Sequence, residues 1–286
     1  MTLVFLVATG LLLGPVSNVY ARGTWRWAYP RLALVGWWLL GISSLSTLTL
    51  ACLWGELPIG FHFSRIVHAS TYRELTGFGA VVLSLWINVA VGLVVSIMIR
   101  AIKSWRDRRH HRRILDLLSP PVRNTIRLPH EATLAYYLPG GRGRVVLSDG
   151  LFDQLGVDAN VVIAHEHAHR QQCHSPLILP FASASHHLHH IAFFRFSTVE
   201  TPLLVECAAD DYAAARWGVE SLQRALSHLS SGAMRTPTCA MAMSDLALDL
   251  RRGRLAREFR PTGLVTSMTA VVVAAVVPSV GLLFLH

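Results

Sequence analysis

The sequence predicts an α-helical membrane protein with about four transmembrane helices and an α+β domain inserted between the third and fourth spans. Three observations predict this fold class. The 286-residue chain is 52% hydrophobic and 15% charged, with a mean hydropathy of +0.41, which is more apolar than a soluble protein of one or two domains. Four stretches approach the roughly 20 apolar residues that cross a bilayer. A block of ordinary polar composition lies between the third and the fourth of them.

The four predicted spans cover about residues 3–20, 32–54, 76–99 and 264–285. The first lacks the basic start and the small-residue cleavage site of a signal peptide, so we expect it to be retained. A cleaved leader followed by three spans is the alternative. The predicted domains are an N-terminal membrane domain with a basic juxtamembrane segment (1–113), a polar α+β domain (114–260) and a C-terminal transmembrane helix (261–286).

The positions of Lys and Arg predict the orientation in the membrane. The loop at 21–31 carries three Arg and no acid, whereas the loop at 55–75 balances two Arg against two Glu. Basic runs also flank the polar domain, at 100–113 and 251–260. We therefore expect this domain to be cytoplasmic and both termini to be extracytoplasmic. The runs contribute much of the +9 net charge, and we expect them to face anionic lipid headgroups rather than nucleic acid.

The polar domain begins with a strand pattern and continues with helices. Short runs rich in β-branched or aromatic residues predict strands at 122–128, 132–138 and 144–148. Pro139-Gly140-Gly141-Arg142-Gly143 predicts a hairpin loop between the last two. We expect the strand at 144–148 to be a sheet edge onto which an extended peptide can add. A helix with Asp158 as its N-cap is expected to follow.

This helix carries His165-Glu166-His167-Ala168-His169, which has the H-E-x-x-H spacing. Four residues advance a helix by a little more than one turn, so His165 and His169 can both reach one metal ion. Glu166 lies about a quarter-turn away, where it can take a proton from a water molecule on the metal. The spacing therefore predicts a catalytic zinc site.

A second helix is predicted from Thr201, as N-cap, to Trp217, with Gly218 closing it. Glu206 and Asp210 stand four residues apart on one of its faces. If that face meets the first helix, Glu206 can be the third zinc ligand, and Asp210 can accept a hydrogen bond from a ligand histidine. An exposed acidic face is the alternative for this pair.

Three motifs together resemble the BlaR/MecR-type integral-membrane zinc peptidases and, more distantly, the HtpX and CAAX-processing peptidases. They are Leu147-Ser148-Asp149-Gly150-Leu151, the H-E-x-x-H motif, and Glu206-Cys207-Ala208-Ala209-Asp210. The resemblance covers most of the chain, from the predicted spans through the second helix. It implies a gluzincin-like site with His165, His169 and Glu206 on one Zn²⁺, Glu166 as the base and Asp210 behind the ligands. The order of the spans is also that of the BlaR/MecR type.

The sequence departs from that group in two ways. BlaR and MecR carry an extracellular penicillin-binding domain after their last span, whereas this sequence stops at His286, so we expect no β-lactam sensing of that kind. The third motif position is usually aliphatic in the group, but here it is His167. It lies about 200 degrees around the helix from His165, so we expect it to face away from the metal.

These features predict a zinc endopeptidase that hydrolyses a protein substrate on the cytoplasmic side of a membrane. The resemblance implies a transcriptional repressor of the BlaI type as that substrate. The alternatives are HtpX-like turnover of membrane proteins and, in another class, a non-catalytic membrane receptor, scaffold or metal sensor. An oxyanion-stabilising donor is also expected, and the candidates are His174, Tyr212 and Arg216.

Two further groups of residues could be given a metal-binding role. Cys173 and Cys207 lie near the metal motifs, but a small buried hydrophobe is the favoured role for each, and no disulfide framework is expected. The other group is His186, His187, His189 and His190. They could bind a second metal or indicate a metal transporter, but the polar side of a helix is the favoured interpretation.

Overall fold

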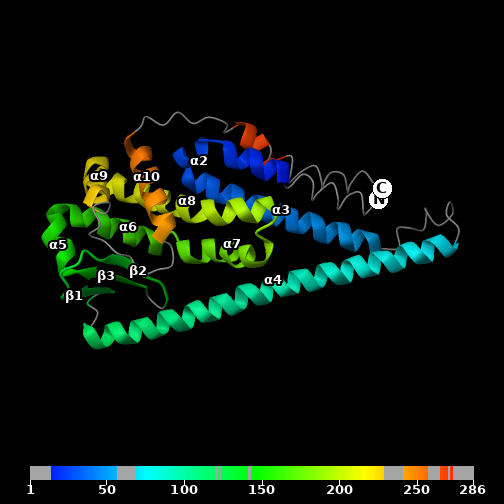
Figure 1. Ribbon diagram of the computed structural model, residues 1–286, viewed down its shortest axis with the longest axis horizontal. Helices are drawn as coiled ribbons and strands as arrows, with labels where there is room; N and C mark the ends of the chain where they lie inside the picture. The colour runs from blue at the N-terminus through cyan, green and yellow to red at the C-terminus, as the bar shows by residue number, and fades with distance from the viewer. Residues whose placement is uncertain are drawn as a thin grey trace.

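The computed structural model describes residues 14–56, 69–119, 122, 124–140, 143–228, 241–256, 265–269 and 271–272, and most of these residues are helical (Figure 1). Residues 14–22 form a helix. The named elements that follow are α2 (Trp25–Ala28), α3 (Pro30–Glu56), α4 (Ala69–Leu118), β1 (Thr125–Leu128), β2 (Ala135–Leu138), β3 (Arg144–Ser148), α5 (Asp149–Leu155), the 3₁₀ turn η2 (Gly156–Asp158), α6 (Ala159–Gln171), α7 (His174–Leu188), α8 (Ala192–Trp217), α9 (Val219–His228) and α10 (Met241–Ala256).

The three predicted strands are present, but their order differs from our expectation. The sheet has the order β1-β3-β2, in which β1 pairs parallel with β3 and β2 pairs antiparallel with it. The predicted hairpin is therefore correct. The prediction that residues 144–148 form an edge strand is wrong, because β3 is hydrogen-bonded on both sides. β2 is the edge strand that lies beside α6 (Figure 1).

The two helices predicted to carry the site are both present. α6 begins one residue after Asp158, but the Asp158 side chain does not cap it and instead pairs with Arg224. α8 begins at Ala192, nine residues before the predicted start at Thr201. Thr201 is buried within the helix, which continues through Pro202, so the predicted N-cap is wrong. Gly218, with φ +87°, ends α8 as predicted.

Two hydrophobic cores hold these helices in place. One joins helix 14–22, α2, α3, α7 and α8, and its largest buried side chains include Trp25 and Trp37. The other packs the sheet against α5, α6, α8 and α9 around Leu151, Val161 and Leu226. Because α8 contributes to both cores, it is fixed along its length beside α6, the helix it contacts most closely.

The predicted set of four transmembrane helices is wrong. Among the described residues one helical segment, Ser84–Leu118 of α4, is long and apolar enough to cross a membrane. α3 contains the whole of the second predicted span, and in it Ala33, Leu34, Trp37 and Leu40 are buried against protein and are not available to lipid. The high hydropathy there reflects a protein core, which composition alone does not distinguish from a span. The first and fourth predicted spans lie largely outside the described residues.

α4 is a single helix of 50 residues that runs along one side of the molecule (Figure 1). None of its most apolar window is buried inside the protein. Its C-terminal end contacts the sheet instead. His111 Nε2 lies 2.8 Å from Tyr136 Oη, Arg112 donates to the carbonyl of Leu138 at 3.2 Å, and Asp116 pairs with Arg144. The apolar helix is therefore attached directly to the domain that holds the candidate site.

Candidate metal centre

His165 and His169 project from one face of α6 toward Glu206 on α8. Around them, Val161, Ala164 and Ala168 are buried and fix the rotation of α6. The small residues Ala208 and Ala209 are fully buried on α8, which allows the two helices to approach closely. The predicted meeting of the two motif helices is therefore present in the structure.

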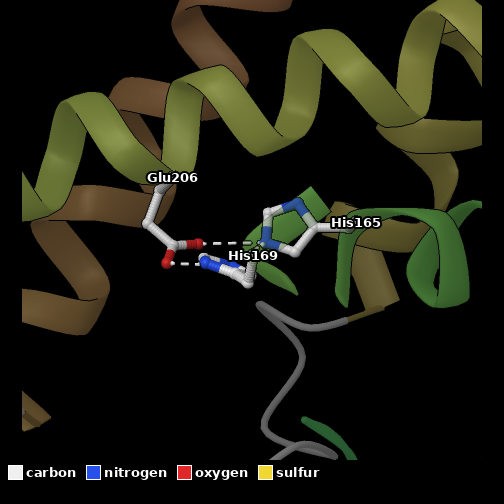
Figure 2. Close-up of side chains that lie close together, drawn as sticks. All are labelled: His165, His169 and Glu206. Atoms are coloured by element: carbon white, nitrogen blue, oxygen red, sulfur yellow. Dashed lines mark hydrogen bonds and ion pairs between the residues drawn. The ribbon is translucent and has the colours of Figure 1, made fainter. Parts of the chain in front are cut away.

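The three side chains form a group that can hold a metal ion (Figure 2). His165 Nε2 lies 3.1 Å from Glu206 Oε2, His169 Nε2 lies 3.5 Å from Glu206 Oε1, and the two Nε2 atoms are 3.2 Å apart. Ligand atoms that lie about 2.0–2.1 Å from a tetrahedral zinc ion are about 3.3 Å from one another. The spacing of these donor atoms therefore fits such an ion without rearrangement of the helices.

Asp210 lies behind His165, as the spacing of the second motif predicts. Its Oδ1 is 3.0 Å from His165 Nδ1, and the carboxylate is fully buried. This carboxylate stabilises a proton on Nδ1, so Nε2, the atom that faces Glu206, is the nitrogen that a metal ion would bind. Burial lowers the pKa of His165, but hydrogen bonds to Asp210 and Glu206 raise it to about 10, so a bound metal ion would displace a proton from Nε2.

Arg251, on α10, neutralises the buried Asp210 and the partly exposed Glu206, and it was not predicted as a site residue. Its guanidinium forms two bonds to Asp210, at 2.6 and 2.7 Å, and its Nη1 lies 3.1 Å from Glu206 Oε2. Although burial raises the pKa of both carboxyls, Arg251 and the neighbouring histidines hold both pKa values below their ordinary range. Glu206 and Asp210 are therefore ionised and correctly oriented in the folded chain.

A second chain of contacts orients His169. Its Nδ1 lies 2.9 Å from Nδ1 of the buried His174, whose Nε2 lies 3.1 Å from Gln172 Oε1. Because Gln172 Oε1 can only accept, His174 donates from Nε2 and accepts at Nδ1. His169 then donates from Nδ1, and its lone pair is on Nε2, toward His165 and Glu206. Burial, followed by the proximity of His169, lowers the pKa of His174 to about 3 and keeps this ring neutral.

Glu166 is placed beside the three candidate ligands, as predicted. Its Oε2 accepts a hydrogen bond of 2.7 Å from the backbone N–H of Tyr137 on β2. Burial raises the pKa of Glu166 to about 7. A carboxyl group with this pKa can both accept and return a proton near neutral pH, which general acid–base catalysis requires.

The other residues singled out in the sequence have different surroundings. His174 contacts His169 and is therefore not free to act on a substrate, Tyr212 donates to Gln171 at 2.7 Å, and Arg216 lies over the Tyr212 ring. His167 is half-buried, and it is not part of the group of three. Cys207 is buried as expected, whereas Cys173 is exposed. Of the predicted histidine cluster, His189 and His190 are exposed, and the side chains of His186 and His187 lie outside the described part of the chain.

Comparison with protein-family models gave no match, and comparisons with curated proteins and with solved structures gave none either. The geometry of the three metal-binding side chains, with Glu166 beside them, is therefore the basis on which a function can be assigned to this chain.

Proposed function

We propose that this chain is a zinc-dependent endopeptidase attached to a membrane by α4. The observation that carries the proposal is the group of His165, His169 and Glu206, whose donor atoms lie 3.1–3.5 Å apart. Two imidazoles and one carboxylate are the ligands of many catalytic zinc sites, and three protein ligands leave a position open for water or substrate. A structural site would have four protein ligands and no need of a base.

Zinc in such a site supplies a Lewis acid for the scissile carbonyl and lowers the pKa of water to about 7. The residues of the chain perform the remaining steps. Glu166 accepts the proton of the attacking water and returns it to the amine of the leaving peptide. The Tyr137 N–H holds the Glu166 carboxylate in place, and Asp210 and His174 hold the two imidazoles.

The edge of β2 supports a peptide as the substrate. β2 pairs with β3 on one side, and on its other side Tyr137 contacts Glu166. An extended segment of a protein that adds beside β2 would pass the catalytic base, with its backbone groups paired to outward groups of the strand other than the Tyr137 N–H, which already donates to Glu166. This substrate geometry replaces the one predicted for β3.

The charge on α4 supports a cytoplasmic location of the site. The apolar part of this helix is followed by six Arg and one Lys between residues 100 and 113, immediately before the sheet. Basic residues at the end of a span mark its cytoplasmic side. We therefore propose a cytoplasmic protein as substrate, and the resemblance to BlaR and MecR favours a transcriptional repressor.

The test uses the full chain and compares Glu166→Gln with Glu220→Gln, an exposed carboxylate on α9. We expect the native chain and both variants to bind about one zinc ion per chain by elemental analysis. Proteins cleaved in cells that contain the native chain should remain intact with Glu166→Gln and be cleaved with Glu220→Gln. Equal cleavage by Glu166→Gln would exclude the proposed base, and binding of zinc with no cleavage by any of the three chains would favour a metal sensor.

A further inference from the structure

The basic end of α4 has two faces, and the sheet occupies one of them. Leu115 is buried against the sheet, and His111 and Arg112 bond to β2. These three positions are spaced by one, three and four residues, so they lie on one side of the helix. The other side of the same segment is exposed.

The exposed side carries a shallow hollow of about 340 Å³. It is lined by Trp105, Arg106, Arg109, His110 and Arg113. The Arg109 guanidinium lies over the Trp105 ring, 5.2 Å from its centroid, and the Trp105 side chain is exposed. A cation placed against an aromatic ring in this way keeps its N–H groups available for a ligand.

The three guanidiniums have no acidic partner within the described part of the chain. Between residues 84 and 118 the acids are Asp107 and Asp116. Asp116 is nearly in line with Arg109 along the helix, but its carboxylate is paired with Arg144 on β3. Asp107 is about 160 degrees around the helix from Arg109. The hollow therefore concentrates positive charge that no acidic side chain in the described part of the chain neutralises.

The position of the hollow along α4 matches the surface of a bilayer. The dense series of exposed apolar positions on α4 ends at Ile102, and after Trp105 exposed apolar side chains return at Ile114, Leu117 and Leu118, near the end of the helix. At about 1.5 Å per residue, Trp105 lies about 4–5 Å beyond Ile102 and Arg109 about 10 Å beyond it. The headgroup layer on each side of the roughly 30 Å hydrocarbon core is about 5–8 Å thick. Trp105 and Arg106 are thus at headgroup depth, where Trp is enriched. The Arg109 guanidinium lies over the Trp105 ring and therefore reaches back to the same depth.

We propose that the face of α4 formed by Trp105, Arg106, Arg109 and Arg113 binds the phosphate headgroup of an acidic phospholipid. The occupant is a lipid of the membrane that α4 crosses, and its phosphate is shared between Arg106 and Arg109. Guanidiniums bind phosphate oxygens through paired N–H groups, and a negatively charged headgroup matches their charge. The inference rests on the membrane location proposed above and does not depend on the peptidase activity.

The test measures lipid bound to the full chain. Purified protein in a mild detergent is incubated with phosphatidylglycerol or phosphatidylcholine, and bound lipids are counted by native mass spectrometry. We expect tighter binding of phosphatidylglycerol, weakened about fivefold for each guanidinium removed in Arg106→Gln and Arg109→Gln. Arg106→Lys with Arg109→Lys keeps the charge and should recover part of the binding.

The matched control is Arg127→Gln with Arg195→Gln, which removes the same charge from exposed positions on β1 and α8. It should leave phosphatidylglycerol binding unchanged. Equal binding of the two lipids, or equal loss in the two double variants, would overturn the proposal. So would competition by duplex DNA at physiological salt, which would identify the hollow as a nucleic-acid site. Zinc content and cleavage, measured on the same samples, should stay at native levels and separate this outcome from failure of the proposed enzyme.

Discussion

Arg251 and Asp210 form a buried two-point ion pair between helices α10 and α8, with Nη2 2.6 Å from Oδ1 and Nε 2.7 Å from Oδ2. The same guanidinium reaches Glu206, and the same carboxylate reaches His165. Arg251 thus contacts one candidate metal ligand, Glu206, directly and is linked to a second, His165, through Asp210. It does so although it lies in a separate segment of the sequence. The three contacts of this guanidinium, together with the contact from Asp210 to His165, make the pair a positioning element of the metal centre.

Replacement of Arg251 should weaken metal binding. Arg251→Gln leaves the buried Asp210 and the partly exposed Glu206 without their cation. We therefore expect zinc affinity to fall about 10–100-fold and stability to fall by about 3–5 kcal/mol. Arg251→Lys keeps the charge and should recover part of both. The measurements are zinc competition with a chelator and thermal unfolding. Arg252→Gln, which removes a neighbouring charge, is the control, and equal zinc affinity in Arg251→Gln and Arg252→Gln would contradict the positioning role.

Glu206→Gln and His169→Ala should lose the metal. Each replacement removes one of three donors and leaves a site with two, which zinc occupies weakly. We expect less than one zinc ion per two chains after dialysis, measured by elemental analysis, with the helical circular dichroism spectrum retained. Glu166→Gln should remain loaded under the same conditions. Full zinc occupancy in Glu206→Gln would remove this residue from the ligand set.

His174 should increase zinc affinity, because its Nδ1 accepts the hydrogen bond that orients His169. His174→Phe removes the acceptor for the His169 N–H, and we expect zinc affinity to drop about tenfold or more. His174→Asn, which retains an acceptor oxygen, should bind more tightly than His174→Phe. Cobalt substitution provides a second readout, because the visible spectrum of the bound ion reports the orientation of its ligands. If His174→Phe bound zinc like His189→Phe, an exposed control, the chain from Gln172 to His169 would have no effect on the site.

The pH dependence of cleavage should follow Glu166. Its pKa is raised to about 7 by burial, and a bound zinc ion would lower it, so the acid limb of kcat/KM should have its midpoint at or below about pH 7. Below that midpoint the carboxyl is protonated and cannot accept the proton of water. The same raised pKa stabilises the metal-free fold only while Glu166 is protonated. This stability contribution is present below the ordinary pKa of 4.5 and is lost as the pH rises toward 7. Activity that stays constant from pH 8 to pH 5 would disagree with this assignment.

A glycine beside the sheet should also be sensitive to substitution. A Cβ at Gly150 would lie 1.9 Å from the carbonyl oxygen of Glu131, which is a backbone atom with little freedom to move. Gly150→Ala should therefore destabilise the domain by about 1–3 kcal/mol in denaturant unfolding. Gly156→Ala is not a neutral control because its φ is +52°, but Gly92→Ala, with open space around it on α4, is one. Equal stability of Gly150→Ala and Gly92→Ala would contradict this close contact.

The local features of the site could be predicted from the sequence because they depend on spacing within one helix. His165 and His169 share a face of any helix that contains both, and so do Glu206 and Asp210. The strands and the β2–β3 hairpin were also marked by local residue types. Arg251 could not be predicted in this way, since a charged residue within a basic run gives no sign of its distant partner. The structure shows that Leu248 and Leu255, on the same helix as Arg251, pack on a hydrophobic core and so hold this helix beside α8 and α9.

The order of the strands and the number of membrane spans could not be predicted, because both depend on which other part of the protein packs beside each segment. The residue pattern of β3 fits an edge strand and a central strand equally well. Its pairing with β1, in addition to β2, shows that both of its sides are occupied. α3 and α4 are similarly apolar, but Trp37 is buried against protein whereas Val91 is exposed. Hydropathy measures the cost of contact with water and does not tell lipid from a neighbouring helix. For this reason the composition overestimated the number of spans.

The contacts from Gln172 through His174 to His169 give the metal centre a single direction of proton donation. A half-rotation of the Gln172 amide would present an N–H group to His174 in place of the oxygen, and each donor and acceptor along the chain would exchange roles. His169 would then carry its proton on the nitrogen that faces Glu206, and it could not bind a cation there. The orientation of one amide, about three residues beyond the motif, thus determines which nitrogen of a candidate ligand is available to a cation, although the amide does not touch that ligand.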